Sequence, residues 1–255
     1  YYSSGLCGSL ISDLEDQGVI VDAVSTGLNA TLLSGYSILV LPNPQGGPLS
    51  QDEISAIADF VQGGGGLILL GDVQYLYLGT KYYYGQPDSL NAVLEGLGVA
   101  NKIQFWGTNN RGDEIIDDTL QIGRRWQQPV GSEYFNPHII SAGIKKVVTN
   151  SASLVVTDSS VIVATSPSTS FTEDVNNVRV RSGRIPWLAA LEVGEGKAVI
   201  CGSSKMFSNV FIAGYGQPFI GYEDNEKLFF NFIWWLTGQR LVAPAVITTF
   251  FPYLD

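Results

Sequence analysis

Residues 37–72 read SILVLPNPQGGPLSQDEISAIADFVQGGGGLILLGD, and this stretch decides the fold. Residues 38–41 form a continuous apolar run, which is typical of a strand buried on both faces of a parallel sheet. Ser50 and Glu53 form a capping box that predicts a helix over residues 51–62. Four glycines then end the helix, and residues 67–70 form a second buried strand. This β-α-β order predicts a right-handed crossover in a parallel sheet.

The pattern continues on both sides of this unit. Residues 6–17 fit a helix before a strand at 19–24, and Asp224 is placed to cap a final helix over residues 225–237. Residues 99–148 are irregular and polar, and strands resume at 153–156, 161–164, 187–193 and 197–201. The chain is therefore predicted to be α/β, with a flavodoxin-like, mostly parallel sheet, helices on both faces and an irregular β-rich insertion.

Composition narrows the class of protein. The chain has 255 residues, and 45% of them are hydrophobic, which is enough for a full core. Its net charge of −10 and its short basic pairs argue against nucleic acid as a partner. No apolar run approaches the length of about 20 residues that a membrane span needs. Only 15% of residues are charged, and Asn29-Ala30-Thr31 is a glycosylation sequon. We therefore expect a processed chain at an extracellular or cell-surface location, with Asn29 as its glycosylation site.

Four segments carry a resemblance to a known family. They are LVLPNPQGGPLSQDEISAIADFVQGGGGLILLGD, FNPHIISAGIKKV, VGEGKAVICGSSKMFSN and DNEKLFFNFIWWLTG. In this order they resemble class I glutamine-amidotransferase-like domains, specifically the non-catalytic branch found in intraflagellar-transport and gliding-motility transport proteins and in uncharacterised secreted prokaryotic proteins. The resemblance implies one amidotransferase-like α/β domain over residues 1–240.

The family's nucleophile is missing from this chain. Catalytic relatives carry a Cys at a sharp turn after a strand, where this sequence reads Gly71-Asp72-Val73. His138 is the single histidine, and its neighbours suggest that it hydrogen-bonds a turn. The sequence therefore predicts no enzyme, no cofactor and no metal. The alternative is a hydrolase that uses Asp72 with a second acidic residue.

Polar residues are expected to gather beyond the carboxyl ends of the parallel strands, where open α/β sheets bind ligands. The candidate ligand-binding residues are Asn43, Asp72, Ser203, Ser204 and Asn209, with Gln45 on the same rim. The alternative is that Asp72 and Ser203 only cap the turns that follow them. Cys7 and Cys201 form a disulfide if the first helix packs beside the late strand, and are otherwise buried thiols.

Three further groups have both a functional and a structural interpretation. Clustered tyrosines are typical of an interface or of a loop folded on its own domain, namely Tyr75, Tyr77, Tyr82, Tyr83 and Tyr84. The acidic residues Asp113, Glu114, Asp117 and Asp118 suit a hard cation or a solvated loop. Arg111-Gly112-Asp113 spells an integrin-type tripeptide that chance and a turn explain.

The two ends of the chain raise the remaining question. Domains of the family start with a central strand, and Tyr1 leads almost directly into a helix instead. Residues 241–255 form a C-terminal extension with strand-forming residues, including Val246, Ile247, Phe250 and Phe251. Four explanations are open. The extension fills the place of the missing central strand in its own sheet, or it fills that place in a neighbouring copy. Otherwise the chain is a segment of a longer multidomain protein, or the extension is a linker.

These observations lead to one expected function. We expect a non-catalytic extracellular module with a structural or assembly role in a cell-surface protein or filament, in which the tail donates a strand. Its expected partners are other copies of the chain or other cell-surface proteins. The alternative is a domain that binds a ligand or a glycan.

Overall fold

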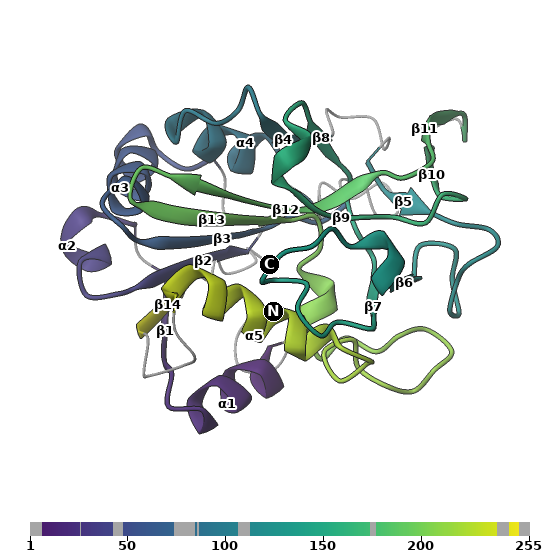
Figure 1. The fold of residues 1–255 in the computed structure, drawn as a ribbon. Coiled ribbons are helices and arrows are strands. Elements are labelled where there is room, and N and C mark those ends of the chain that lie inside the picture. The colour runs from purple at the N-terminus through teal and green to yellow at the C-terminus, as the bar shows by residue number, and fades with distance from the viewer. Residues whose placement is uncertain are drawn as a thin grey trace.

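The computed structural model describes residues 7–25, 27–42, 48–73, 85, 87–106, 113–173, 177–238 and 245–249. They form a mixed α/β domain around a seven-stranded sheet (Figure 1). In spatial order the strands of this sheet are β1 (Ile20–Val24), β14 (Ala245–Thr249), β2 (Ile38–Pro42), β3 (Gly66–Leu70), β13 (Gly196–Cys201), β12 (Pro186–Val193) and β9 (Ile162–Thr165). The first five strands are parallel to one another, and β12 runs antiparallel to both of its neighbours, β13 and β9.

Helices pack on both faces of the sheet (Figure 1). They are α1 (Gly8–Asp16), α2 (Ala30–Leu33), α3 (Gln51–Gln62), α4 (Pro87–Gly96) and α5 (Asn225–Thr237). Alternate residues of β2 enter opposite cores, because successive side chains of a strand point to opposite faces. Ile38 and Val40 join the core under α1 and α5, whereas Leu39 and Leu41 join the core under α2, α3 and α4.

The capping box at the start of α3 is confirmed. The Ser50 hydroxyl accepts a hydrogen bond from the Glu53 backbone N–H (3.3 Å), and the Glu53 carboxylate accepts one from the Ser50 N–H (2.8 Å). The same carboxylate also accepts from the N–H of Leu28 (3.2 Å), which fixes the loop before α2 against α3.

The predicted cap on α5 is wrong in its detail. Asp224 occupies the N-cap position without a side-chain hydrogen bond to the helix. Its carboxylate accepts instead from the backbone N–H groups of Lys145 (2.7 Å) and Lys146 (3.2 Å). The side chain therefore joins the helix start to β7 (Lys146–Thr149) rather than saturating the helix end.

The irregular insertion consists of small sheets beside the main one. Three strands form one sheet in the order β11 (Arg179–Ser182), β10 (Phe171–Glu173) and β5 (Ile115–Ile116). Two two-stranded sheets complete the insertion. One pairs β4 (Ile103–Phe105) with β8 (Leu154–Val156), and the other pairs β6 (Gln128–Gly131) with β7. The strand predicted at residues 153–156 thus lies in the insertion, outside the main sheet. Short 3-10 turns occur at Ser132–Tyr134, Ser159–Val161 and Lys205–Phe207.

The C-terminal strand lies inside this chain's own sheet. β14 pairs in parallel with β1 on one side and with β2 on the other, with Val246 opposite Val21 and Ile38. Among the described residues, β1 reaches the rest of the sheet only through β14. Residues 245–249 of the predicted extension thus form an internal strand of the main sheet.

Candidate functional site

Two of the predicted rim residues, Asp72 and Ser204, meet where β3 and β13 end. The N–H of Gly71 donates to the carbonyl of Cys201 (2.8 Å), and the N–H of Ser204 donates to the carbonyl of Gly71 (2.8 Å). The Ser204 hydroxyl then donates to the Asp72 carboxylate. Asp72 is only 5% exposed, so this pair is buried between the two strand ends.

The other rim residues differ in what the structure says of them. Ser203 is buried, and its hydroxyl accepts from the N–H of Met206 (3.3 Å), as in the capping interpretation. Asn209 lies near the start of α1, because a Cβ built on Gly8 would stand 3.8 Å from its Nδ2. Asn43 and Gln45 lie outside the described residues.

The predicted disulfide is not formed, and both cysteines are free. The Cys201 thiol faces the Ser203 carbonyl (3.5 Å) and the Met206 sulfur (3.9 Å) instead. Burial raises the pKa of each thiol to about 12, and the charge of Asp72 adds to the rise in both cases. Raised pKa values disfavour the thiolate at neutral pH, and the thiolate is the reactive form of cysteine.

His138 lies far from these thiols. Its Nδ1 accepts from the N–H of Ile140 (3.1 Å), as the turn interpretation expects, and its ring packs against Trp235. Burial, followed by the charge of Lys197, lowers its pKa. Lys197 is the second residue of β13, whereas Cys201 is its last, about 13 Å away at roughly 3.3 Å per strand residue. His138 and Cys201 therefore do not form a Cys–His pair.

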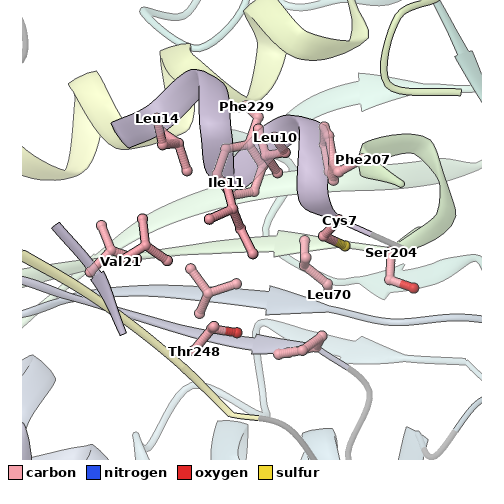
Figure 2. A pocket seen from close by; sticks show the side chains of 13 residues that line it. Cys7, Leu10, Ile11, Leu14, Val21, Leu70, Ser204, Phe207, Phe229 and Thr248 are labelled. Carbon is pink, nitrogen blue, oxygen red and sulfur yellow. The ribbon is translucent and has the colours of Figure 1, made fainter. Parts of the chain in front are cut away.

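An apolar cavity of about 60 Å³ lies between α1 and the sheet. Figure 2 shows Cys7 and Ser204 together at one end, with the α1 side chains above the strands. The lining comprises Cys7, Leu10, Ile11, Leu14, Val21, Val40, Pro42, Leu70, Ser204, Phe207, Phe229, Val246 and Thr248. The space would hold a few waters by volume, but an almost wholly apolar lining offers water too few hydrogen-bond partners. It is an apolar gap beside β14.

Sequence reasoning found one wall of this cavity and missed the other. The apolar face of α1 follows from the spacing of Leu10, Ile11 and Leu14. The opposite wall includes Val246 and Thr248, whose place in the sheet depends on where the tail folds. No local pattern in the sequence specifies that position.

The acidic segment is not the solvated loop that we expected. Asp113 and Asp117 are buried, and Asp118 pairs with Arg125 (2.9 Å). Burial acts to raise the pKa of Asp117, but hydrogen bonds from Thr169, Leu120 and Thr119 outweigh it, so the pKa is lowered. Among the residues that the structure describes, no group of three or more His, Cys, Asp or Glu side chains could hold a metal ion.

Asn225 is a buried polar centre that sequence reasoning missed. Its amide nitrogen donates to the carbonyls of Val148 (2.8 Å), Met206 (3.1 Å) and Phe219 (2.8 Å), and its amide oxygen accepts from the N–H of Val148 (2.9 Å). This one side chain joins α5, β7 and the turn after β13. The sequence signals only an Asn in the first turn of a helix, which is usually exposed.

The remaining predicted sites are accessible to different degrees. Asn29 is exposed, and its side-chain oxygen accepts from the N–H of Leu32 (3.0 Å) at the start of α2. Val246 is buried in the core of its own chain. Several candidates lie outside the described residues: Tyr75, Tyr77, Tyr82, Tyr83, Tyr84, Arg111, Gly112, Phe250 and Phe251. The side chain of Ile247 is also not described. Within the described parts of the chain, no helix combines the length and apolar character needed to span a membrane.

Comparison with known proteins gives a family and a fold. A family model described as a domain of unknown function (DUF4350) matches residues 7–233. Among curated proteins, none matches the sequence. The solved mmIFT52 N-terminal domain has a TM-score of 0.66 at 16% identity and covers 94% of each chain. A cytoplasmic protein from Salmonella typhimurium has a TM-score of 0.48 at 14% identity, over 89% of this chain and 85% of that one.

A third similar structure is a putative ThuA-like protein from Bacteroides uniformis, with a TM-score of 0.40 at 12% identity over 85% of this chain and 75% of that one. At these identities the likeness to the mmIFT52 domain shows the fold alone. That fold fits the amidotransferase-like class in broad outline.

Proposed function

The chain belongs to the DUF4350 family, a domain of unknown function, and we propose that it is a non-catalytic module that joins copies by exchanging its C-terminal strand. We assign its sheet to the flavodoxin-like type and the chain to the non-catalytic branch of the amidotransferase-like class. The turn Gly71-Asp72-Val73, with no Cys or Ser, supports this assignment. So do the raised pKa values of both thiols.

One observation carries the proposal, namely the position of β14. The strand comes from the end of the chain, yet it lies between β1 and β2 and bonds to both. A second copy's tail would make the same contacts in the same place, so exchange conserves every native interaction of the strand. An unfilled gap would leave backbone groups of β1 and β2 without partners, which makes an empty intermediate costly.

Local concentration decides between the closed and exchanged forms. A short linker gives the tail an effective concentration in the millimolar range for its own sheet. Only residues 239–244 separate Gly238, at the end of α5, from β14. Exchange therefore requires that neighbouring copies be present at a local concentration comparable to the effective concentration of the chain's own tail. Arrays on a surface or filaments provide such a concentration. The low charge and the exposed sequon at Asn29 support an extracellular setting.

The hydrolase alternative has less support than strand exchange. It requires a second acidic group at a defined distance from Asp72. Asp72 is buried and receives the hydroxyl of Ser204. This environment gives no specific support to acid–base chemistry.

A pair of single-cysteine variants tests the exchange. Thr248 lies opposite Val40 in the register, and both side chains line the cavity, so cysteines there would be adjacent. In a Cys7→Ala/Cys201→Ala background, one tagged chain carries Val40→Cys and a differently tagged chain carries Thr248→Cys. The two are mixed at millimolar concentration and oxidised, and heterodisulfides are measured on non-reducing gels.

Exchange predicts disulfides between the two tags, together with an intrachain disulfide in the Val40→Cys/Thr248→Cys double variant. Leu39→Cys is the matched control, because Leu39 faces the opposite core and should not link to Thr248→Cys. If the double variant closes within its own chain and the mixture gives no heterodisulfide, strand exchange is excluded.

A further inference from the structure

Among the described residues, β1 and β11 are edge strands of their sheets. In the main sheet, β1 has a partner on one side only. The opposite edge is covered, because the N–H and the side-chain amide of Asn136 donate to the carbonyls of Val163 (2.8 Å) and Ile162 (2.8 Å) in β9. In the three-stranded sheet, β11 is likewise paired on one side only. Open edges are templates for pairing with another chain.

Both open edges expose apolar side chains that β-strands favour. Ile20, at the start of β1, is 59% exposed. Val180, within β11, is 45% exposed. The exposed valine and isoleucine side chains therefore indicate surfaces that a strand from another molecule would cover.

The two edges differ in the charge around them. The first 80 residues contain no Lys or Arg and eight acidic side chains, namely Asp13, Glu15, Asp16, Asp22, Asp52, Glu53, Asp59 and Asp72. Asp22 lies in β1 itself, and the exposed Glu15 and Asp16 end the helix that leads to it. The β1 edge therefore carries a net negative charge.

The β11 edge carries the opposite charge. Five of the chain's seven arginines lie at or near the three-stranded sheet, namely Arg124, Arg125, Arg179, Arg181 and Arg184. Arg125 is neutralised by Asp118 and Glu173. The guanidinium of Arg179 is exposed and lies over the Phe171 ring at 3.8 Å. Within the described residues, no ion pair engages Arg179.

We propose that the β1 edge of one copy of this chain docks on the β11 edge of a second copy, in a head-to-tail contact. Strand pairing supplies the backbone hydrogen bonds, and Asp22 of one copy faces Arg179 of the next. Pairing of two β1 edges would bring acidic residues against acidic residues, and two β11 edges would oppose arginines. Opposed like charges are destabilising, so charge selects the head-to-tail arrangement over both symmetric ones.

The arrangement of the two edges determines the kind of assembly. β1 and β11 lie at opposite ends of the molecule (Figure 1). A contact between two different surfaces leaves one free edge at each end, so it generates a ring or an open filament rather than a closed dimer. This contact is separate from strand exchange, because it uses the free side of β1 and exchange replaces the partner on its other side.

A charge swap tests the docking. Asp22→Lys makes the β1 edge basic, and Arg179→Asp makes the β11 edge acidic, both at exposed positions. Each variant alone should associate at least about ten-fold more weakly than the wild type in sedimentation velocity at low salt. An equimolar mixture should recover association, because every contact between unlike variants is then complementary. Asp59→Lys is the matched control, since it makes the same charge change on α3, away from the edge, and should associate like the wild type.

Amide hydrogen exchange identifies the surface that forms. Docking predicts slower exchange at β1 and β11 on association, and a loss of association as salt rises. The proposal is overturned if the wild type stays monomeric at millimolar concentration, if both variants associate like the wild type, or if the mixture fails to recover. The cysteine pair at Val40 and Thr248 reports exchange independently, so either proposal can fail without the other.

Discussion

Replacing Val246 by Ile should stabilise this protein, although Val246 is only 1% exposed. The added methyl group would enter the cavity that Val246 lines, where it gains contacts without displacing neighbours. One buried methylene contributes about 0.8 kcal/mol to the free energy of unfolding. For a chain of this length, that corresponds to a rise in Tm of about 2–3 °C.

The opposite change gives the opposite sign. Val246→Ala removes two methyl groups and enlarges the cavity, so we expect a loss of about 2 kcal/mol and a fall in Tm of about 4–8 °C. Urea unfolding with an unchanged m-value measures both free energies. Because β14 holds β1 on the sheet, the Ala variant should also increase amide exchange in β1.

Val199→Ile is the matched control. Val199 is fully buried in the same core, but it does not line the cavity. The same added methyl group should there force neighbours apart and destabilise the fold by about 1–3 kcal/mol. If Val246→Ile destabilises the protein as much as Val199→Ile does, the space beside β14 is already filled and the reasoning fails.

Two further predictions concern titratable groups. Asp117→Asn should destabilise the fold by about 2–4 kcal/mol at pH 7, because an amide nitrogen cannot accept from the hydroxyls of Thr169 and Ser170. The pKa of Asp117 is lower in the folded than in the unfolded state. Ionised Asp117 therefore stabilises the fold fully above the unfolded pKa of about 3.9, and this stabilisation is lost as the pH falls through the folded pKa. The difference in the free energy of unfolding between the wild type and Asp117→Asn should therefore shrink as the pH is lowered. Urea unfolding at a series of pH values from 7 to 2 measures this difference, and a constant difference would contradict the prediction. With both pKa values at about 12, Cys7 and Cys201 should react with iodoacetamide at pH 8 far more slowly in the folded than in the urea-unfolded chain. Equal rates would show that the fold does not shield the thiols from reaction.

The local elements of this fold can be predicted from the sequence because their causes are local. The apolar run of β2, the capping box of α3 and the glycines after it each act within a few residues. The meeting of Asp72 with Ser204 is also predictable, since the ends of neighbouring parallel strands share one edge of the sheet.

Other features depend on partners that are remote in sequence. The same acidic run is a solvated loop or a buried centre, depending on whether Thr169 and Ser170 reach Asp117. The sequence predicts that Asp224 caps α5, but its carboxylate accepts hydrogen bonds from the N–H groups of Lys145 and Lys146 instead. The strand propensity of residues 246–251 is local, but the choice of sheet is not. Sequence patterns specify what a segment can form, and remote contacts decide where it pairs.

Both proposals meet at β1, and this has an energetic consequence. β14 attaches β1 to the sheet on one side, and the proposed docking covers β1 on the other. A partner that binds only the ordered form of β1 shifts the equilibrium toward the state in which β14 is also seated, whichever copy supplies that strand. Docking should therefore slow amide exchange in β14 as well as in β1. Reciprocally, Val246→Ala should weaken docking even though Val246 is buried away from the docking edge.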